Sequence, residues 1–165
     1  MSADLILSEN EILVGEDLYA KAINIILASA QHELLIFDQD LCRGDFCSLL
    51  NSRLLEQFLS KNLNSRLTIV LQNTEAFKEN CPRIVNLLYL FGHKMTIHET
   101  NQSVKHAKDC FVIADSKHYV KRIHIDQARF TYATSDAEKV VSLNIRFKEI
   151  LDNTQSTVTI MNLGL

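Results

Sequence analysis

Apolar and polar residues follow two periods along this chain, and these periods predict that helices and strands alternate in its first part. Residues 16–31 begin with Glu16 and Asp17, an acidic first turn, and carry apolar residues at helical spacing. The same spacing predicts further helices over residues 47–64, 82–92 and 135–152. Short apolar runs bounded by polar residues predict buried strands over residues 33–37, 66–71 and 94–98.

The later part of the chain has a different pattern. Apolar and β-branched residues predict consecutive strands over residues 109–114, 119–125 and 129–133. Weaker signals favour short strands at 11–14 and 157–160, and Ser135 with Glu138 is typical of a capping box. Strands joined by helices pair in parallel, and strands joined by short turns do not. The order therefore predicts an α/β fold of three layers, α/β/α, with a mixed, mainly parallel sheet.

The composition is that of one globular domain. The chain has 165 residues, of which 47% are hydrophobic and 22% charged, with only four Gly and one Pro. We expect a single domain over residues 1–165 with a core from about 16 to 153. Apolar stretches such as 23–28 are too short to cross a bilayer, and no basic leader precedes an apolar run. A cytoplasmic protein with no membrane contact is therefore expected.

Charge is unevenly distributed. Seventeen Lys and Arg stand against 20 Asp and Glu, a formal net charge of −3, which argues against non-specific nucleic-acid binding. Residues 103–129, by contrast, hold six Lys and Arg against three Asp. This local excess of +3 is consistent with an anion site, although a solvated face of a sheet produces the same pattern.

Several cofactor and metal motifs are absent. The sequence has no G-x-G-x-x-G turn, phosphate-binding loop, H-E-x-x-H or G-x-S-x-G. Cys42, Cys47, Cys81 and Cys110 form no C-x-x-C pair, which is poor spacing for zinc or an iron–sulfur cluster. We expect free, mostly buried thiols, no cofactor and no bound metal.

The sequence His106-Ala107-Lys108 is the most suggestive short motif. On a strand, residues two apart share a face, so the imidazole and the ammonium could converge on one anion. Histidine can attack phosphorus and lysine can balance the charge of the phosphoryl oxygens. The plainer interpretation is a solvated loop that happens to contain His and Lys.

Polar residues follow each of the predicted buried strands. The carboxyl ends of parallel strands meet at one edge of a sheet, where α/β folds place ligand sites. The acidic loop that begins at Asp38 could hold a metal, but capping or solvating the chain is the commoner role. The candidate ligand-binding residues are Asp40, Gln72, His98, Lys121 and Arg122.

Four stretches of the chain resemble a known superfamily. They are residues 34–41 (LLIFDQDL), 66–73 (RLTIVLQN), 111–122 (FVIADSKHYVKR) and 146–153 (RFKEILDN). With the order of elements, they resemble one half of a phospholipase D-like protein over about 130 residues. The chain is most similar to a bacterial family of unassigned function with this fold.

The resemblance implies a degenerate catalytic motif. Active relatives carry H-x-K, four residues, then Asp, followed by Gly-Ser and Asn. If His106 and Lys108 are that pair, Ile113 stands in the Asp position, and residues 132–136 contain no Gly-Ser. The alternative alignment places FVIAD on the motif strand, with the His and Lys replaced and His106 upstream of the motif.

We therefore expect a non-catalytic phospholipase D-like domain that binds a protein partner or an anionic, phosphate-containing ligand. The alternative is a metal-independent phosphodiesterase or nuclease with a rearranged site, in which His106 and Lys108 are catalytic. The resemblance also implies a two-fold homodimer, because phospholipase D-like proteins usually join two such halves. Removing exposed apolar surface would favour that association.

Overall fold

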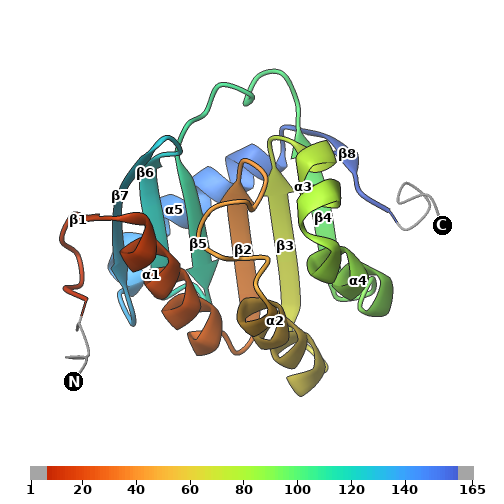
Figure 1. Cartoon of the computed structure of the whole chain (residues 1–165), viewed down its shortest axis with the longest axis horizontal. Helices are drawn as coiled ribbons and strands as arrows, with labels where there is room; N and C mark the ends of the chain where they lie inside the picture. Colours follow the sequence, from red (N-terminus) through yellow and green to blue (C-terminus); the bar gives the residue numbers. More distant parts are fainter. Residues whose placement is uncertain (1–6, 160–165) are drawn as a thin grey trace.

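The structure is a computed structural model and describes residues 7–159. Strands and helices alternate up to the fourth strand, three strands then follow without a helix, and a long helix leads to the last strand (Figure 1). The elements are β1 (Leu13–Val14), α1 (Glu16–Ser29), β2 (Glu33–Asp38), α2 (Leu49–Lys61), β3 (Arg66–Leu71), α3 (Thr74–Asn80), α4 (Pro82–Leu90), β4 (Met95–Thr100), β5 (Cys110–Ala114), β6 (His118–His124), β7 (Gln127–Ala133), α5 (Ala137–Leu151) and β8 (Thr154–Thr157).

One mixed sheet crosses the molecule, with strand order β1-β7-β6-β5-β2-β3-β4-β8. The predicted mixed α/β fold is confirmed, but the sheet is not mainly parallel. Only the β2–β3 and β3–β4 pairs are parallel, and the other neighbours run antiparallel. The reason lies in the connections. Helices join β2, β3 and β4, whereas the short turns 115–117 and 125–126 join β5, β6 and β7 and can link only antiparallel strands.

Helices cover the sheet unequally. Helices α1 to α4 lie on one face and α5 lies on the other (Figure 1). Alternate residues of the central strands enter two separate cores, so that Leu34 and Ile36 of β2 face α1, whereas Phe37 faces α5. On the α5 face, the ring of Phe111 lies 5.6 Å from that of Phe37 and 6.3 Å from that of Phe147.

The helix caps differ from the expected ones. Asp136, not Ser135, caps α5, because Ser135 takes a left-handed backbone (φ 58°) and its amide donates to His118 Nδ1. Helix α3 was not predicted, and Asn73 caps it by accepting from the Ala76 amide at 3.1 Å. In the tail, β8 begins earlier than predicted, and Ile160 lies outside the described residues.

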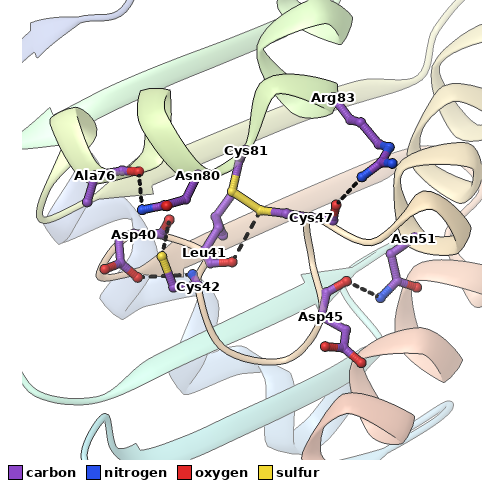
Figure 2. Close-up of a disulfide and its surroundings, with 10 residues drawn as sticks. All are labelled: Asp40, Leu41, Cys42, Asp45, Cys47, Asn51, Ala76, Asn80, Cys81 and Arg83. Atoms are coloured by element: carbon purple, nitrogen blue, oxygen red, sulfur yellow. Dashed lines mark hydrogen bonds between the residues drawn. A yellow bond between two sulfur atoms is a disulfide. The ribbon is translucent and has the colours of Figure 1, made fainter.

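Cys47 and Cys81 form a disulfide, so the expectation of four free thiols is wrong (Figure 2). Their Cα atoms lie 5.2 Å apart, although 34 positions separate them in the sequence. The fold brings the loop after β2 against the junction of α3 and α4, and nothing in local spacing signals this contact. Cys42 and Cys110 remain free. Over residues 7–159, no helix is both long and apolar enough to cross a membrane.

Candidate functional site

A small hollow lies where β2 and β3 end and β5 begins. It encloses about 280 Å³, including its open mouth. The loop between β4 and β5, which arches above the sheet in Figure 1, supplies much of its wall. This strand-end hollow is lined by Gln39, Gln72, Lys105, Ala107, Lys108, Asp109 and Ile125. Of the predicted site residues, the structure brings Gln72 and Lys108 together here.

Gln72 holds the wall of the strand-end hollow in place. Its Nε2 donates to the carbonyl oxygens of Val104 (3.1 Å) and Ala107 (2.8 Å). Its Oε1 accepts from the hydroxyl of Thr100, which is itself completely buried. The Gln72 amide therefore orders the loop and has little capacity left for a ligand.

Of the three charged residues in this hollow, two are neutralised within the protein. Lys105 Nζ donates to the carbonyl oxygen of Gln72 at 2.5 Å and lies 3.7 Å from a carboxylate oxygen of Glu99. Asp109 accepts two hydrogen bonds from Arg146, at 2.8 and 2.6 Å. Lys108 is exposed and forms no ion pair within residues 7–159. It is therefore the cation available to an anion here.

The Glu99 carboxylate supports the base of this loop. Burial alone would raise its pKa, but hydrogen bonds from Thr74 and Gln155 and the charge of Lys105 lower the pKa below its ordinary value. The Thr74 hydroxyl donates to Glu99 Oε1 at 2.8 Å. Glu99 stays ionised at neutral pH and holds the Lys105 ammonium by their ion pair.

His106 faces a different hollow. Residues 102–106 form turns, so 106–108 are not on a strand and the predicted shared face is wrong. His106 lines a larger, open hollow of about 700 Å³ beside α5, together with Arg146, Glu149 and Asn153. The imidazole and the Lys108 ammonium therefore line separate surfaces.

Arg122 is part of the scaffold. It is completely buried on the α1 face of the sheet, and its guanidinium donates to both carboxylate oxygens of Glu16 and to the carbonyl oxygen of Ile125. Its carbon centre lies 4.9 Å from the ring centroid of Tyr19. Burial would lower the pKa of Arg122, but the hydrogen bonds and charge of Glu16 raise it overall.

Lys121, the next residue on β6, pairs with Phe111 and so lies on the opposite, α5 face. The structure therefore does not bring Lys121 and Arg122 together, although they are adjacent in the sequence. Neither residue lines the strand-end hollow.

Asp40 and His98 lie apart from the hollow as well. Asp40 Oδ1 accepts from the Cys42 amide at 3.0 Å within the loop after β2. His98 lies inside β4 rather than at its end, with Nδ1 3.2 Å from the hydroxyl of Thr157. Desolvation lowers the pKa of His98, which favours the neutral ring. Both side chains therefore make contacts within the protein and do not line the strand-end hollow.

A buried polar cluster was not predicted. Cys110 on β5 pairs with Arg122 on β6, Asp38 is the last residue of the neighbouring strand β2, and the Tyr19 hydroxyl is 3.6 Å from Cys110 Sγ. Burial raises the pKa of Asp38 to about 7 and raises the pKa of the Cys110 thiol well above its ordinary value. In the sequence, Asp38 stood only as the first polar residue of a loop.

Asp115 occupies the turn at the other end of β5. Its carboxylate accepts hydrogen bonds from the backbone amides of Gln31, His32 and Glu33 at 2.7–2.9 Å. Burial would raise its pKa, but these hydrogen bonds lower the pKa below its ordinary value. Asp115 therefore ties the β5–β6 turn to the start of β2.

Solved structures share this fold at low sequence identity. Nuc from Salmonella typhimurium, a phospholipase D family member, aligns with a TM-score of 0.55 and 11% identity over 90% of this chain and 98% of its own. NucT from Helicobacter pylori aligns with a TM-score of 0.54 and 10% identity over 87% and 96%.

A third structure is TrmBL2, an archaeal chromatin protein described as showing a novel mode of DNA binding. It aligns with a TM-score of 0.67 and 10% identity over 94% of this chain. The chain spans only 56% of the TrmBL2 chain. These likenesses show the phospholipase D-like fold.

None of the curated proteins matches the sequence. Residues 16–163 match the family described as "Domain of unknown function (DUF7931)", which covers most of the chain and includes the strand-end hollow. The chain therefore belongs to the DUF7931 family and has a phospholipase D-like fold.

Proposed function

We propose that this protein is a non-catalytic phospholipase D-like domain that binds an anionic, phosphate-containing ligand in the strand-end hollow, with Lys108 as the binding cation. The observation that supports this most is the position of Asp115 just after β5, where its carboxylate accepts hydrogen bonds from three backbone amides at the start of β2. We therefore align Asp115 with the Asp of the motif H-x-K, four residues, Asp.

Counting back from Asp115 identifies the residues that replace the catalytic pair. Cys110 falls in the Lys position and Lys108 falls in the His position. Cys110 is buried and uncharged at neutral pH, so it cannot balance phosphoryl charge. A lysine in the histidine position can still attract a phosphate, but it lacks the imidazole that forms the covalent intermediate in active relatives.

The geometry disfavours the rearranged catalytic site. His106 and Lys108 line separate hollows, so their side chains do not face one common reacting atom. In that alignment the Asp position is Ile113, which is completely buried in the core beside α5.

A small phosphate-bearing ligand suits the charge better than a long nucleic acid. In the basic segment 103–129, Arg122 is neutralised by Glu16 and Lys105 by Glu99. Duplex binding requires many phosphate contacts, and these paired cations are not free to make them. The other possible outcome is DNA binding, as described for TrmBL2. It would be recognised by an affinity for DNA that falls strongly as the salt concentration rises.

The test is calorimetric titration of the protein with inorganic phosphate, using Lys108→Gln and a matched control, Lys117→Gln. Lys117 is exposed at the opposite end of β5. We expect Lys108→Gln to weaken binding roughly tenfold, since a charged hydrogen bond is lost, and Lys117→Gln to bind as the wild type does. Equal binding by all three proteins would contradict the proposal.

A parallel assay addresses catalysis. Turnover of bis-p-nitrophenyl phosphate without added metal should stay at background. Turnover that His106→Ala abolishes would favour the phosphodiesterase instead.

A further inference from the structure

The disulfide joins Cys81, at the start of α4, to Cys47 in the loop of residues 39–48, whose first residue, Gln39, lines the strand-end hollow. We propose that Cys47–Cys81 is a reducible clamp: a dithiol reductant opens it, which loosens residues 39–48 and weakens anion binding in the strand-end hollow. The loss of anion binding rests on the proposed function, whereas the loosening of the loop does not.

The disulfide can be reached from solvent. Both cysteines line an open hollow of about 660 Å³, the disulfide hollow, together with Leu41, Cys42, Asp45, Ser48 and Asn80. Cys47 is partly exposed, whereas Cys81 is completely buried. Thiol–disulfide exchange requires a thiolate to approach one sulfur, and Cys47 is the more exposed of the two cysteines.

Cys81 is placed as the leaving group. It is the N-cap of α4, a nine-residue helix, and the sulfur released when Cys47 is attacked. A helix N-terminus stabilises a thiolate. The reductant thiolate therefore forms a bond to Cys47 Sγ while the protein S–S bond breaks, and Cys81 departs with the electron pair and then takes up a proton.

A second thiol of the reductant completes the reaction. It attacks the mixed disulfide, its own sulfur atoms become joined, and Cys47 is released as a thiolate. The protein gains two electrons and two protons in total, and the dithiol loses them.

Cys42 does not replace the external reductant. Its thiol lies in the disulfide hollow, but desolvation and the neighbouring Asp40 carboxylate raise its pKa to about 11. At neutral pH it is therefore protonated, and a thiol in that form is a poor nucleophile.

The loop of residues 39–48 connects the disulfide to the strand-end hollow. Gln39, at its start, lines the strand-end hollow, and Arg43 forms an ion pair with Asp126 at 3.7 Å, next to the lining residue Ile125. The disulfide fixes the far end of the loop at Cys47. A change at the disulfide can therefore reach the wall of the strand-end hollow through a continuous stretch of backbone.

The loop backbone needs this support. Leu41 (φ 63°) and Asp45 (φ 56°) take left-handed conformations that side chains disfavour, and such residues persist only where surrounding contacts hold them. Gly44 packs so closely on α1 that a Cβ there would lie 3.0 Å from Tyr19 and Ile23. Leu41 and Phe46 are buried anchors, so opening the disulfide loosens the loop without unfolding it.

The test compares oxidised and dithiothreitol-reduced wild-type protein with Cys81→Ser and, as the control that keeps the disulfide, Cys42→Ser. Amide hydrogen exchange of residues 39–48 and calorimetric titration with inorganic phosphate are measured for each. Reduction without denaturant should accelerate exchange in the loop about tenfold and weaken phosphate binding about threefold. Cys81→Ser should match the reduced wild-type protein both with and without dithiothreitol. Cys42→Ser should respond to reduction as the wild type does.

The contrary results are distinct. Two results would contradict the proposed clamp. Either the disulfide reacts with the reductant only after denaturation, or reduction leaves amide hydrogen exchange of residues 39–48 unchanged. Faster exchange with unchanged phosphate affinity overturns the regulation. If the oxidised protein binds no phosphate, the proposed function fails and the regulation with it. The exchange data involve no phosphate and therefore separate that failure from failure of the clamp.

Discussion

Arg122 and Glu16 form a two-pronged ion pair that joins β6 to the first turn of α1. The Nη1–Oε1 distance is 2.6 Å and the Nη2–Oε2 distance is 3.0 Å. Arg122 has no exposed side-chain surface, whereas that of Glu16 is 59% exposed. The pair therefore fixes a buried guanidinium under a carboxylate that water still reaches, and it sets the position of α1 over the sheet.

Removing Arg122 should destabilise the protein strongly. Arg122→Ala leaves a cavity against Tyr19 and removes the hydrogen bonds to Glu16 and to two carbonyl oxygens, so we expect a loss of about 3 kcal/mol in the free energy of unfolding. Asp17→Asn, at an exposed neighbouring position, should change it by less than about 0.5 kcal/mol. Urea unfolding measures both values, and equal stabilities would contradict the structural role of Arg122.

Asp38 should make stability depend on pH. Burial raises its folded-state pKa from 3.8 to about 7, so between these values the folded protein holds a proton that the unfolded chain has lost. The contribution of Asp38 to stability is therefore full below pH 4 and is lost as the pH rises to about 7. The loss amounts to at most about 4 kcal/mol.

Asp38→Asn should remove this dependence. Its unfolding free energy should vary less than that of the wild type between pH 4 and 7, as measured by denaturation at several pH values. Identical pH profiles would show that Asp38 titrates normally in the folded protein.

Asp115 should act in the opposite pH direction. Its folded-state pKa is lowered below the ordinary value of 3.8. Its contribution to stability is therefore present at pH values above 3.8 and is lost as the pH falls through the lowered pKa. Asp115→Asn should cost about 2 kcal/mol at neutral pH, because charge-assisted bonds to backbone amides are weakened. Lys117→Gln, in the same turn, should leave stability unchanged. A matching loss in both variants would contradict this role.

The predicted homodimer is tested by light scattering at micromolar concentration. Two chains of 18.8 kDa would give a mass of about 38 kDa. A mass that stays near that of one chain would contradict self-association.

Local sequence patterns predicted most of the elements. The run at Arg66–Leu71 was predicted to the residue because polar residues bound it on both sides. Helix α3 was missed because it is short and mostly polar, with only Phe77 as a large buried side chain. The sequence predicts a mainly parallel sheet because the order of strands along the chain does not reveal which strands pair.

The candidate site was harder to predict because its features arise from tertiary contacts. Charged residues are ordinarily exposed, so no sequence pattern places Arg122 and Asp38 in the interior. The strand-end hollow depends on how Gln72 holds the loop before β5, a contact across 32 to 35 positions. The cytoplasmic location stays a prediction.

The proposed anion site is tested most directly by mapping phosphate binding residue by residue. In a titration followed by amide chemical shifts, the largest changes should gather at Gln39, Gln72, Lys105 to Asp109 and Ile125, and should disappear in Lys108→Gln. Shifts centred on the turn at Asp115 to Lys117, or no saturable shifts in the wild type, would contradict a phosphate site at the strand-end hollow.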